Sequence, residues 1–337
     1  MIYTLFKKAA FRMNPELVHT LTLKGLRLTH RRDKRHFLAG RFADKPVELM
    51  GLRFPNAIGL AAGMDKNGDY IDALGGLGFG FVEIGTITPR PQSGNPKPRL
   101  FRIPEQDAII NRMGFNNKGV DHLCKQVMRT RYNGILGINI GKNSDTPLEN
   151  AADDYVTCMN AVFHLADYIA VNISSPNTIG LRELQEGQIF NDLIARLKAE
   201  QIRLNKSRNT PVPLLIKIAP DLSPEEIRFM GTCMLENDID GVIATNTTIK
   251  RDGLESYETA RESGGLSGYP LQDLSTHVIR QLSEVLQGRI PIIGVGGIMD
   301  GTSAVAKLDA GATLVQVYSG LIYRGPGIIG DIAQSLP

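Results

Sequence analysis

Residues 214–226 read Leu-Leu-Ile-Lys-Ile-Ala-Pro-Asp-Leu-Ser-Pro-Glu-Glu and contain one strand followed by the start of one helix. The first five residues form a short apolar run, which is typical of a strand buried on both faces. Ser223 and Pro224, followed by two glutamates, then supply an N-cap, a first-turn proline and acidic first-turn residues. The stretch therefore predicts a strand over 214–218 and a helix over 223–237.

The same strand-then-helix unit recurs along the chain from about residue 57. Runs with strand character cover residues 57–61, 81–85, 136–140, 168–172, 214–218, 241–245, 290–295 and 314–318. Helix-like stretches, such as 188–204 and 273–286, stand between most of them. Eight such units predict an α/β fold, the (β/α)8 TIM barrel, with a doubly wound open sheet as the alternative.

The first 45 residues differ from the rest and predict two short amphipathic helices. Apolar residues between positions 2 and 13 recur at the spacing of one helical face, with Lys7, Lys8 and Arg12 off that face. Asn14 and Pro15 then predict the cap and first turn of a second helix. We expect a helical extension over 1–45 and a catalytic barrel over 46–337. The extension is either a cap packed on the barrel bottom or a hairpin that enters a membrane surface.

The charge of the chain is strongly asymmetric, although the total is only +3. Residues 1–41 hold ten Lys or Arg against two acidic residues, whereas the remainder holds 28 basic and 33 acidic ones. A basic amphipathic segment gains about 1 kcal/mol per Lys or Arg near an anionic membrane. No apolar run approaches the roughly 18 residues that a membrane span needs. We therefore expect residues 1–41 to dock on an anionic membrane surface, and the protein to be peripheral.

The three cysteines, Cys124, Cys158 and Cys233, are far apart and form no metal-ligand or disulfide pattern, which predicts reduced thiols in a reducing, cytoplasmic compartment. No predicted strand ends in a histidine or a carboxylate. Hydrolytic triads and divalent-metal sites therefore have no support, and we expect no metal. The chemistry is predicted to come from an organic cofactor.

The predicted strands end in polar residues or glycine, and barrel enzymes place their active sites at these ends. Residues 294–297 and 318–320 follow the last two strands, where backbone N–H groups can hold phosphate, and we favour this over plain turn glycines. Lys217 ends an apolar strand and needs an anion or a ligand, unless it only extends to the surface. On pattern alone, Lys66 is compatible with a plain surface position. Asparagines at 111, 139, 172, 177 and 246 suit a small planar ligand with amide edges.

Three motifs carry a resemblance to a known family that extends over the whole chain. They are Asn172-Ile-Ser-Ser-Pro-Asn-Thr178, Gly59-Leu-Ala-Ala-Gly-Met-Asp-Lys-Asn67 and the proline-rich run 88–99. In these motifs the chain closely resembles the class 2, membrane-associated, quinone-dependent dihydroorotate dehydrogenases. The resemblance implies a barrel that holds FMN, oxidation of (S)-dihydroorotate to orotate in de novo pyrimidine (UMP) synthesis, and reoxidation of the flavin by a membrane quinone. It also implies a position on the cytoplasmic side of the inner membrane, with the extension as the quinone entrance.

The resemblance also implies roles for individual residues. Ser175 would be the general base that removes the C5 proton while a hydride passes from C6 to flavin N5. The orotate-binding set would be Lys66, Asn111, Met113, Gly114, Phe115, Asn172, Asn177, Asn246 and Thr247. The FMN-binding set would be Ala62, Gly63, Lys66, Thr86, Asn139, Asn172, Lys217, Thr245, Gly268, Gly297, Tyr318 and Ser319. A serine is a poor base near neutral pH. A relay is therefore needed, and Thr178 is the candidate that the resemblance suggests.

Other interpretations use part of the same pattern. Without the resemblance, Ser175 could be a loop-capping hydroxyl before Pro176. A different FMN barrel enzyme that acts on uracil-like rings would more often carry a cysteine base, and a cofactor-free barrel isomerase or lyase fits the strand pattern alone. The basic N-terminus could bind nucleic acid, but no aromatic stacking platform accompanies it, and we expect no nucleic-acid partner.

Overall fold

The computed structural model describes residues 2–30, 36, 38–40 and 45–337, and its centre is a closed barrel of eight parallel strands. The strands are β3 (Ile58–Leu60), β4 (Phe81–Ile87), β7 (Ile135–Ile140), β8 (Tyr168–Asn172), β9 (Leu214–Ile218), β10 (Gly241–Ala244), β12 (Ile292–Val295) and β13 (Leu314–Val317). β13 pairs with β3 and closes the ring. Each strand overlaps one predicted run, so the barrel is confirmed and the open sheet is excluded.

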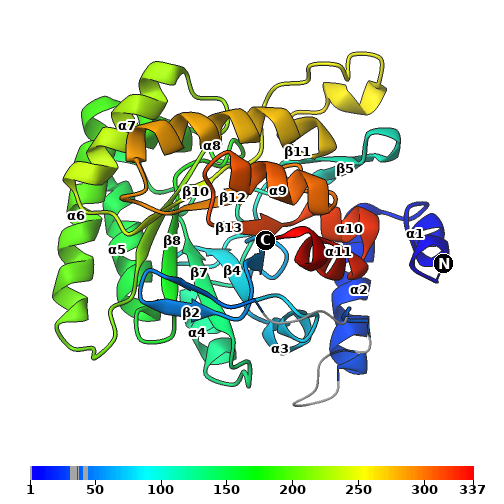
Figure 1. The fold of residues 1–337 in the computed structure, drawn as a ribbon, viewed down its shortest axis with the longest axis horizontal. Helices are drawn as coiled ribbons and strands as arrows, with labels where there is room; N and C mark the ends of the chain where they lie inside the picture. The colour runs from blue at the N-terminus through cyan, green and yellow to red at the C-terminus, as the bar shows by residue number, and fades with distance from the viewer. Residues whose placement is uncertain (1, 31–35, 37, 41–44) are drawn as a thin grey trace.

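Helices follow the strands and cover the outside of the barrel (Figure 1). They are α3 (Ile71–Gly75), α4 (Val120–Val127), α5 (Ala151–Val162), α6 (Gly187–Asn205), α7 (Pro224–Glu236), α8 (Gln272–Leu286), α9 (Gly301–Asp309), α10 (Ser319–Arg324) and α11 (Gly327–Ser335). The predicted cap of α7 is present, because Ser223 Oγ accepts from the Glu226 amide and the Glu226 carboxylate accepts from the Ser223 amide. Short 3₁₀ helices are η1 (Pro104–Gln106), η2 (Leu148–Asn150), η3 (Leu181–Gln185), η4 (Glu258–Arg261) and η5 (Tyr269–Leu271).

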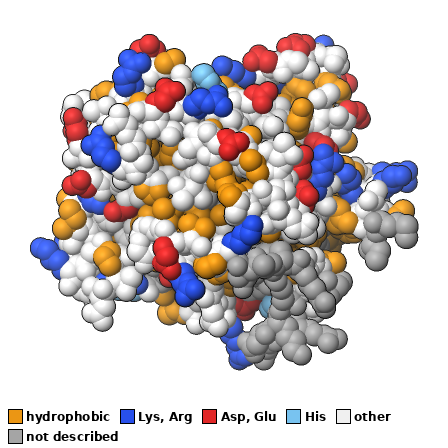
Figure 2. Space-filling view, in the orientation of Figure 1, with side chains coloured by type: hydrophobic (Ala, Val, Ile, Leu, Met, Phe, Trp, Pro, Cys, Tyr) orange, Lys and Arg blue, Asp and Glu red, His pale blue; other side chains and the backbone are white. Residues whose placement is uncertain are grey.

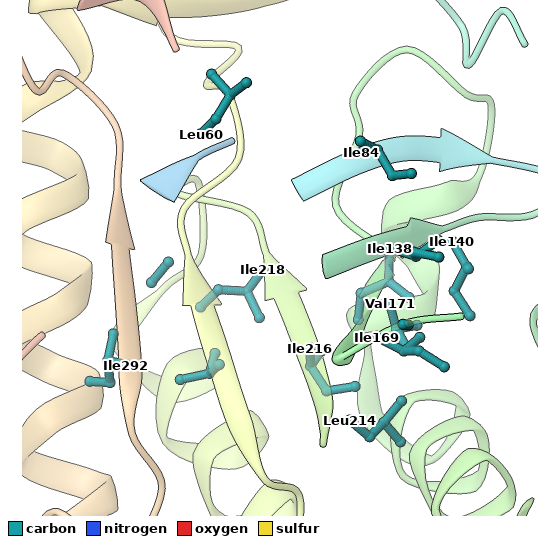
Figure 3. Packing of buried hydrophobic residues seen from close by; sticks show 14 of the residues in the cluster. Leu60, Ile84, Ile138, Ile140, Ile169, Val171, Leu214, Ile216, Ile218 and Ile292 are labelled. Atoms are coloured by element: carbon teal, nitrogen blue, oxygen red, sulfur yellow. The ribbon is translucent and has the colours of Figure 1, made fainter. Parts of the chain in front are cut away.

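Side chains alternate between the two faces of each strand and form two separate cores. Those that face the helices are aliphatic and pack from strand to strand, as Figure 3 shows for Ile138, Ile169 and Ile216. Full burial of each contributes about 1.5–3 kcal/mol. Those that face the interior form a second cluster, which includes Phe81 and Tyr168 near the N-terminal end of the barrel. Towards the C-terminal ends of the strands the side chains inside the barrel become polar, so a binding site can form there.

Two small sheets lie outside the barrel, and the sequence patterns did not predict them. β1 (Val47–Leu49) and β2 (Leu52–Phe54) form a hairpin, and the Phe54 ring packs edge-on against Phe81 at 5.2 Å between centroids. This hairpin covers the N-terminal end of the barrel. In the insert at 86–135, β5 (Leu100–Ile103) pairs with β6 (Ala108–Asn111), and β11 (Gly265–Gly268) adds to β6 from the loop after β10.

The two predicted N-terminal helices are present as α1 (Ile2–Ala10) and α2 (Pro15–Thr29). Tyr3 and Lys7 anchor α1, because their side chains donate to the carbonyls of Ile322 and Tyr323 at 2.6 and 3.0 Å. α2 contacts α3 and β5 rather than the bottom of the barrel, where the β1–β2 hairpin lies. The interpretation as a bottom cap is therefore wrong. Five basic residues of the extension lie outside the described residues, namely Arg31, Arg32, Lys34, Arg35 and Arg41. The predicted end of the extension, near residue 45, borders one of these segments.

Much of the apolar surface of the extension is exposed, although Ala10 and Leu23 are buried. Large side chains on it are strongly exposed, among them Leu5, Phe6, Met13, Leu17, Leu21 and Leu28. Figure 2 shows basic and hydrophobic side chains next to each other at the α1 end of the molecule. Within the described part of the chain, every helix is too short or too polar to cross a membrane.

Candidate functional site

A cavity of about 1210 Å³, counted with its open mouth, lies at the C-terminal ends of the barrel strands. This is large enough for a cofactor together with a small substrate. The predicted site residues that line it are Ala62, Gly63, Lys66, Thr86, Asn111, Met113, Gly114, Phe115, Asn172, Ser175, Asn177, Lys217, Thr245, Asn246, Thr247, Gly268, Gly297, Tyr318 and Ser319. Residues that are up to 257 positions apart in the chain, from Ala62 to Ser319, therefore meet in one place.

Two predicted site residues lie behind the wall of the cavity. Asn139 is fully buried beneath it, where its side-chain oxygen accepts from Thr86 Oγ1 at 2.6 Å and its nitrogen donates to Glu83 at 2.9 Å. Asn139 thus orients Thr86, which does line the cavity. Thr178 is also buried, and its hydroxyl has no hydrogen-bond partner among the described residues.

One wall of the cavity suits a flat, anionic group. Lys217 is almost fully buried and has a carboxylate at 3.8 Å, but no hydrogen bond satisfies its ammonium within the described part of the chain. At Gly297 the backbone φ is +73°, and a Cβ would lie 2.3 Å from the Cα of Gln272. Only glycine fits there, and its backbone is left open to the cavity. The Lys217 ammonium, which lacks a hydrogen bond within the described residues, and the open backbone at Gly297 fit a flavin that carries a phosphate group.

Next to this wall lie amides and hydroxyls that hold one another in place, and Asn172 among them pairs in register with Lys217. Asn177 donates to Asn111 at 3.2 Å, and Asn246 donates to Asn172 at 3.2 Å. The side-chain oxygen of Asn177 is buried and has no hydrogen-bond partner among the described residues, so it can still accept a hydrogen bond. This arrangement suits a small ring with several N–H and C=O groups.

Ser175 stands beside this amide cluster on the loop that follows β8. Its Oγ accepts from the backbone N–H of Asn177 at 3.3 Å, and the residue is 7% exposed. Arg182 supports the loop, because its guanidinium donates to the Ser174 and Thr247 carbonyls and to Asp221. Ser175 and Thr178 share no hydrogen bond in the described structure.

Lys66 lines the cavity, so the surface position that its pattern alone allowed is wrong. Its ammonium donates to the Gly63 carbonyl at 2.9 Å. Burial, reinforced by the charge of Arg99, lowers the pKa of Lys66 to about 8. A lysine in this state retains its charge near neutral pH and needs an anionic partner.

Sequence reasoning missed several residues of the site. Glu16 and His19 reach the cavity from α2, and burial together with the charge of Lys66 lowers the pKa of His19 to about 4. Nothing local in the sequence indicated this, because the contact depends on how α2 packs. Glu83 and Gln316 lie inside the barrel, and each interrupts an apolar strand as Lys217 does. That signal was present in the sequence.

A metal centre has no counterpart in the described residues, where no three His, Cys, Asp or Glu side chains are placed to hold an ion. The three cysteines are free thiols, and Cys158 and Cys233 are buried.

The barrel, the polar end of its interior and the buried Lys217 beside an open glycine loop fit the class of flavin-dependent barrel oxidoreductases. The family model for dihydroorotate dehydrogenase matches residues 46–337. The chain is 58% identical over 335 residues to a dihydroorotate dehydrogenase (quinone) of Cellvibrio japonicus, covering 99% of this chain and 98% of that one. It is 55% identical to the enzyme of the same name from Acinetobacter baylyi, over the full length of both.

Solved structures agree with these sequence relationships. Two crystal structures of dihydroorotate dehydrogenase from Eimeria tenella, one ligand-free and one in complex with ferulenol, superpose with TM-scores of 0.87 and 0.85. Both are 38% identical and cover 95% of this chain, which covers 93% and 89% of theirs. The chain belongs to the dihydroorotate dehydrogenase family, and within it to the quinone-dependent class.

Proposed function

We propose that the cavity binds FMN and dihydroorotate side by side, that Ser175 removes the C5 proton of the substrate, and that the electrons leave to a membrane quinone. The activity, oxidation of dihydroorotate to orotate with a quinone as acceptor, follows from family membership. The observation that supports the residue roles is that Ser175 lines the same cavity as the amide cluster and the buried ammonium of Lys217.

Two features of the cavity wall support FMN as the cofactor, the buried ammonium of Lys217 and the open backbone of the Gly297 loop. When bound, FMN would accept the electrons that leave dihydroorotate, and its ring would carry negative charge at N1 and O2 once reduced. Lys217 supplies a buried cation for that charge, and the Gly297 loop offers backbone N–H groups to a phosphate. Thr86 and the other cavity-lining residues of the proposed FMN set complete this wall, and Asn139 supports Thr86 from behind it.

The proposed substrate set recognises orotate by shape and hydrogen bonding. Asn111, Asn172, Asn177 and Asn246 can donate to ring carbonyls and accept from ring N–H groups. Lys66 supplies the positive charge for the carboxylate of the substrate. Met113, Gly114, Phe115 and Thr247 would line the same pocket. A site with this many buried polar groups rejects an analogue that lacks the matching ones.

Ser175 would act as the base from a nearly buried position on the wall of the cavity. Its ordinary hydroxyl is a weak base, so the proton must pass onward to a second group. Thr178 is buried and has an unused hydroxyl on the same loop, which suits a relay that a bound water completes. Arg182 holds the carbonyl next to Ser175 and so keeps the hydroxyl aimed at the amide cluster.

The helical extension would connect the cavity with the membrane. Glu16 and His19 reach the cavity from one face of α2, while Leu17 and Leu21 are exposed on another. A quinone that entered along α2 would move from lipid to the flavin wall without crossing water. The excess of Lys and Arg in residues 1–41 supports docking on an anionic surface, from the cytoplasmic side of the inner membrane.

Anaerobic titration tests the whole proposal. Purified protein should be yellow, and its flavin absorbance should bleach with one equivalent of dihydroorotate. Addition of a quinone should restore the colour, whereas fumarate or NAD should not. A colourless protein would exclude FMN and leave a cofactor-free barrel enzyme. Bleaching by another reduced pyrimidine ring, but not by dihydroorotate, would contradict the substrate.

A further inference from the structure

A fully buried carboxylate lies directly beneath the cofactor wall of the cavity. Glu83 is the third residue of β4, points into the barrel and is 0% exposed. It does not line the cavity itself, but Gln316 and Lys217 do, and both lie next to it. The roles proposed above leave this charged group without a task. A buried charge is costly, so its presence calls for a physical reason.

The hydrogen bonds of Glu83 hold its charge in one place. Oε1 accepts from Asn139 Nδ2 at 2.9 Å. Oε2 accepts from the Tyr168 hydroxyl at 2.9 Å and from Gln316 Nε2 at 2.7 Å. These three donors come from three other strands of the barrel. They satisfy a carboxylate without neutralising it, because none of them carries a charge.

The nearest opposite charge is the Lys217 ammonium, at 3.8 Å from Oε1. Both side chains are almost fully buried, and the pair is too long for a direct hydrogen bond. Lys217 therefore faces the cavity with a fixed negative charge behind it. A charge within about 4–6 Å shifts an ionisation equilibrium by about ten- to thousand-fold, and the same force acts on any charge that forms nearby.

We propose that Glu83 is a positioning residue that sets the reduction potential of the bound cofactor. It holds Lys217, Asn139 and Gln316 in register and offsets part of the positive charge that Lys217 presents to the ring. This inference rests on the proposed function of the cavity as the FMN site. Because reduction adds negative charge to the ring, a carboxylate beneath it disfavours the reduced form and lowers the potential. Electrons would then pass more readily to a quinone.

Glu83→Gln tests the charge with little change in shape. The new amide nitrogen would face Tyr168 and Gln316 in place of Oε2. The Tyr168 hydroxyl can turn to accept. Gln316 Oε1 is buried and has no partner within the described part of the chain, so it can accept once its amide turns over. The other half of the new side chain still accepts from Asn139. The network can therefore survive while the negative charge is lost.

The experiment is a dye-equilibrated potential titration of the FMN-loaded full chain. We expect Glu83→Gln to favour reduction at least tenfold over wild type, a rise of about 30 mV for a two-electron couple. Asp240→Asn is the matched control. It removes one carboxylate charge at the N-terminal end of β10, where Asp240 pairs with Lys198 and accepts from the Leu214 amide. Its potential should equal that of wild type. An unchanged potential in Glu83→Gln would overturn the proposal, and so would an equal rise in both variants.

A second comparison keeps the proposal testable if Glu83→Gln does not fold because Lys217 is left without its partner. The double variant Glu83→Gln with Lys217→Met removes both charges and is compared with Lys217→Met alone. The double variant should have the higher potential by the same factor, and equal potentials would overturn the role of Glu83. The wild-type titration separates the two levels of inference, because a wild-type protein that holds no FMN refutes the proposed function instead.

Discussion

Arg99 Nη2 lies 2.8 Å from Glu16 Oε1, and this ion pair joins helix α2 to the segment that leads into β5. The contact is bidentate, since Arg99 Nε also donates to Glu16 Oε2 at 3.3 Å. Arg99 is buried and donates to two backbone carbonyls as well. The extension is therefore fastened to the catalytic barrel by a partly buried charge pair beside the cavity.

Glu16→Gln should loosen α2 more than it disturbs the substrate end of the site. Removal of the charged partner should weaken α2 docking by about 2 kcal/mol. We expect quinone turnover to fall and protease cleavage near α2 to become faster, while the rate at which dihydroorotate bleaches the flavin changes less. Glu48→Gln, in the exposed pair with Arg53, is the control and should change neither. Loss of bleaching in Glu16→Gln would contradict the division of roles.

The same pair should weaken in acid. Burial opposes the charge of Glu16, but the hydrogen bond and charge of Arg99, aided by Lys97, outweigh it and lower the pKa of Glu16. A carboxyl group whose pKa is lower in the folded than in the unfolded protein stabilises the folded state at a pH above its unfolded-state pKa. This stabilisation is lost as the pH falls through the pKa of the folded state. Below about pH 4.5, the usual value for glutamate, quinone turnover should therefore fall before bleaching does.

Ser175→Ala should separate binding from chemistry. Flavin content and orotate binding should persist, because within the described residues the hydroxyl accepts one long hydrogen bond, from the backbone N–H of Asn177 at 3.3 Å. Loss of a positioned base should slow flavin bleaching by about 10²–10⁴-fold in stopped flow. Ser175→Cys keeps an ionisable group and should recover part of the rate at high pH. A bleaching rate in Ser175→Ala equal to wild type would remove Ser175 from the mechanism.

Lys66 should make orotate binding dependent on pH. Burial and the charge of Arg99 lower its pKa to about 8, so the free enzyme loses this positive charge as pH rises past 8. The Kd for orotate, followed by the flavin absorbance change, should then rise by up to about tenfold per pH unit. Lys66→Met should bind orotate weakly, with a Kd that stays flat between pH 7 and 9. A flat profile in the wild-type protein would contradict a role for Lys66 in holding the carboxylate.

The barrel strands could be predicted because their signal is local. Each of the eight runs is apolar over four to six residues, since both faces of a barrel strand are buried, and each ends at a polar residue or glycine. The β5–β6 hairpin carries no such signal. β5 is only partly buried, and the buried strand β6 pairs with β11, where Asn111 lies opposite Gly265. Pairing across 154 positions cannot be seen in a local pattern.

The site residues at the strand ends could be predicted from the sequence, whereas those from helix α2 could not. Residues at strand ends, such as Lys217 and Asn172, could be placed because barrel geometry brings all strand ends together. His19 could not be placed, since the sequence pattern does not specify which face of α2 meets the cavity. Glu83 could have been found by the argument used for Lys217, a charged residue within an apolar strand.

Exposed apolar side chains on α2 should anchor the protein to lipid. Leu17 and Leu21 are 49% and 50% exposed and stand one helical turn apart, so both can enter a membrane surface at once. The double change Leu17→Glu with Leu21→Glu removes this apolar area and adds charge that an anionic surface repels. In cosedimentation with vesicles that contain anionic lipid, we expect at least tenfold weaker binding, with turnover of a soluble quinone analogue largely retained.

Ile202→Glu on α6 is the matched control, because Ile202 is 53% exposed far from the extension, and this variant should bind like wild type. Equal binding of the α2 variant and wild type would show that lipid contact lies elsewhere on the molecule.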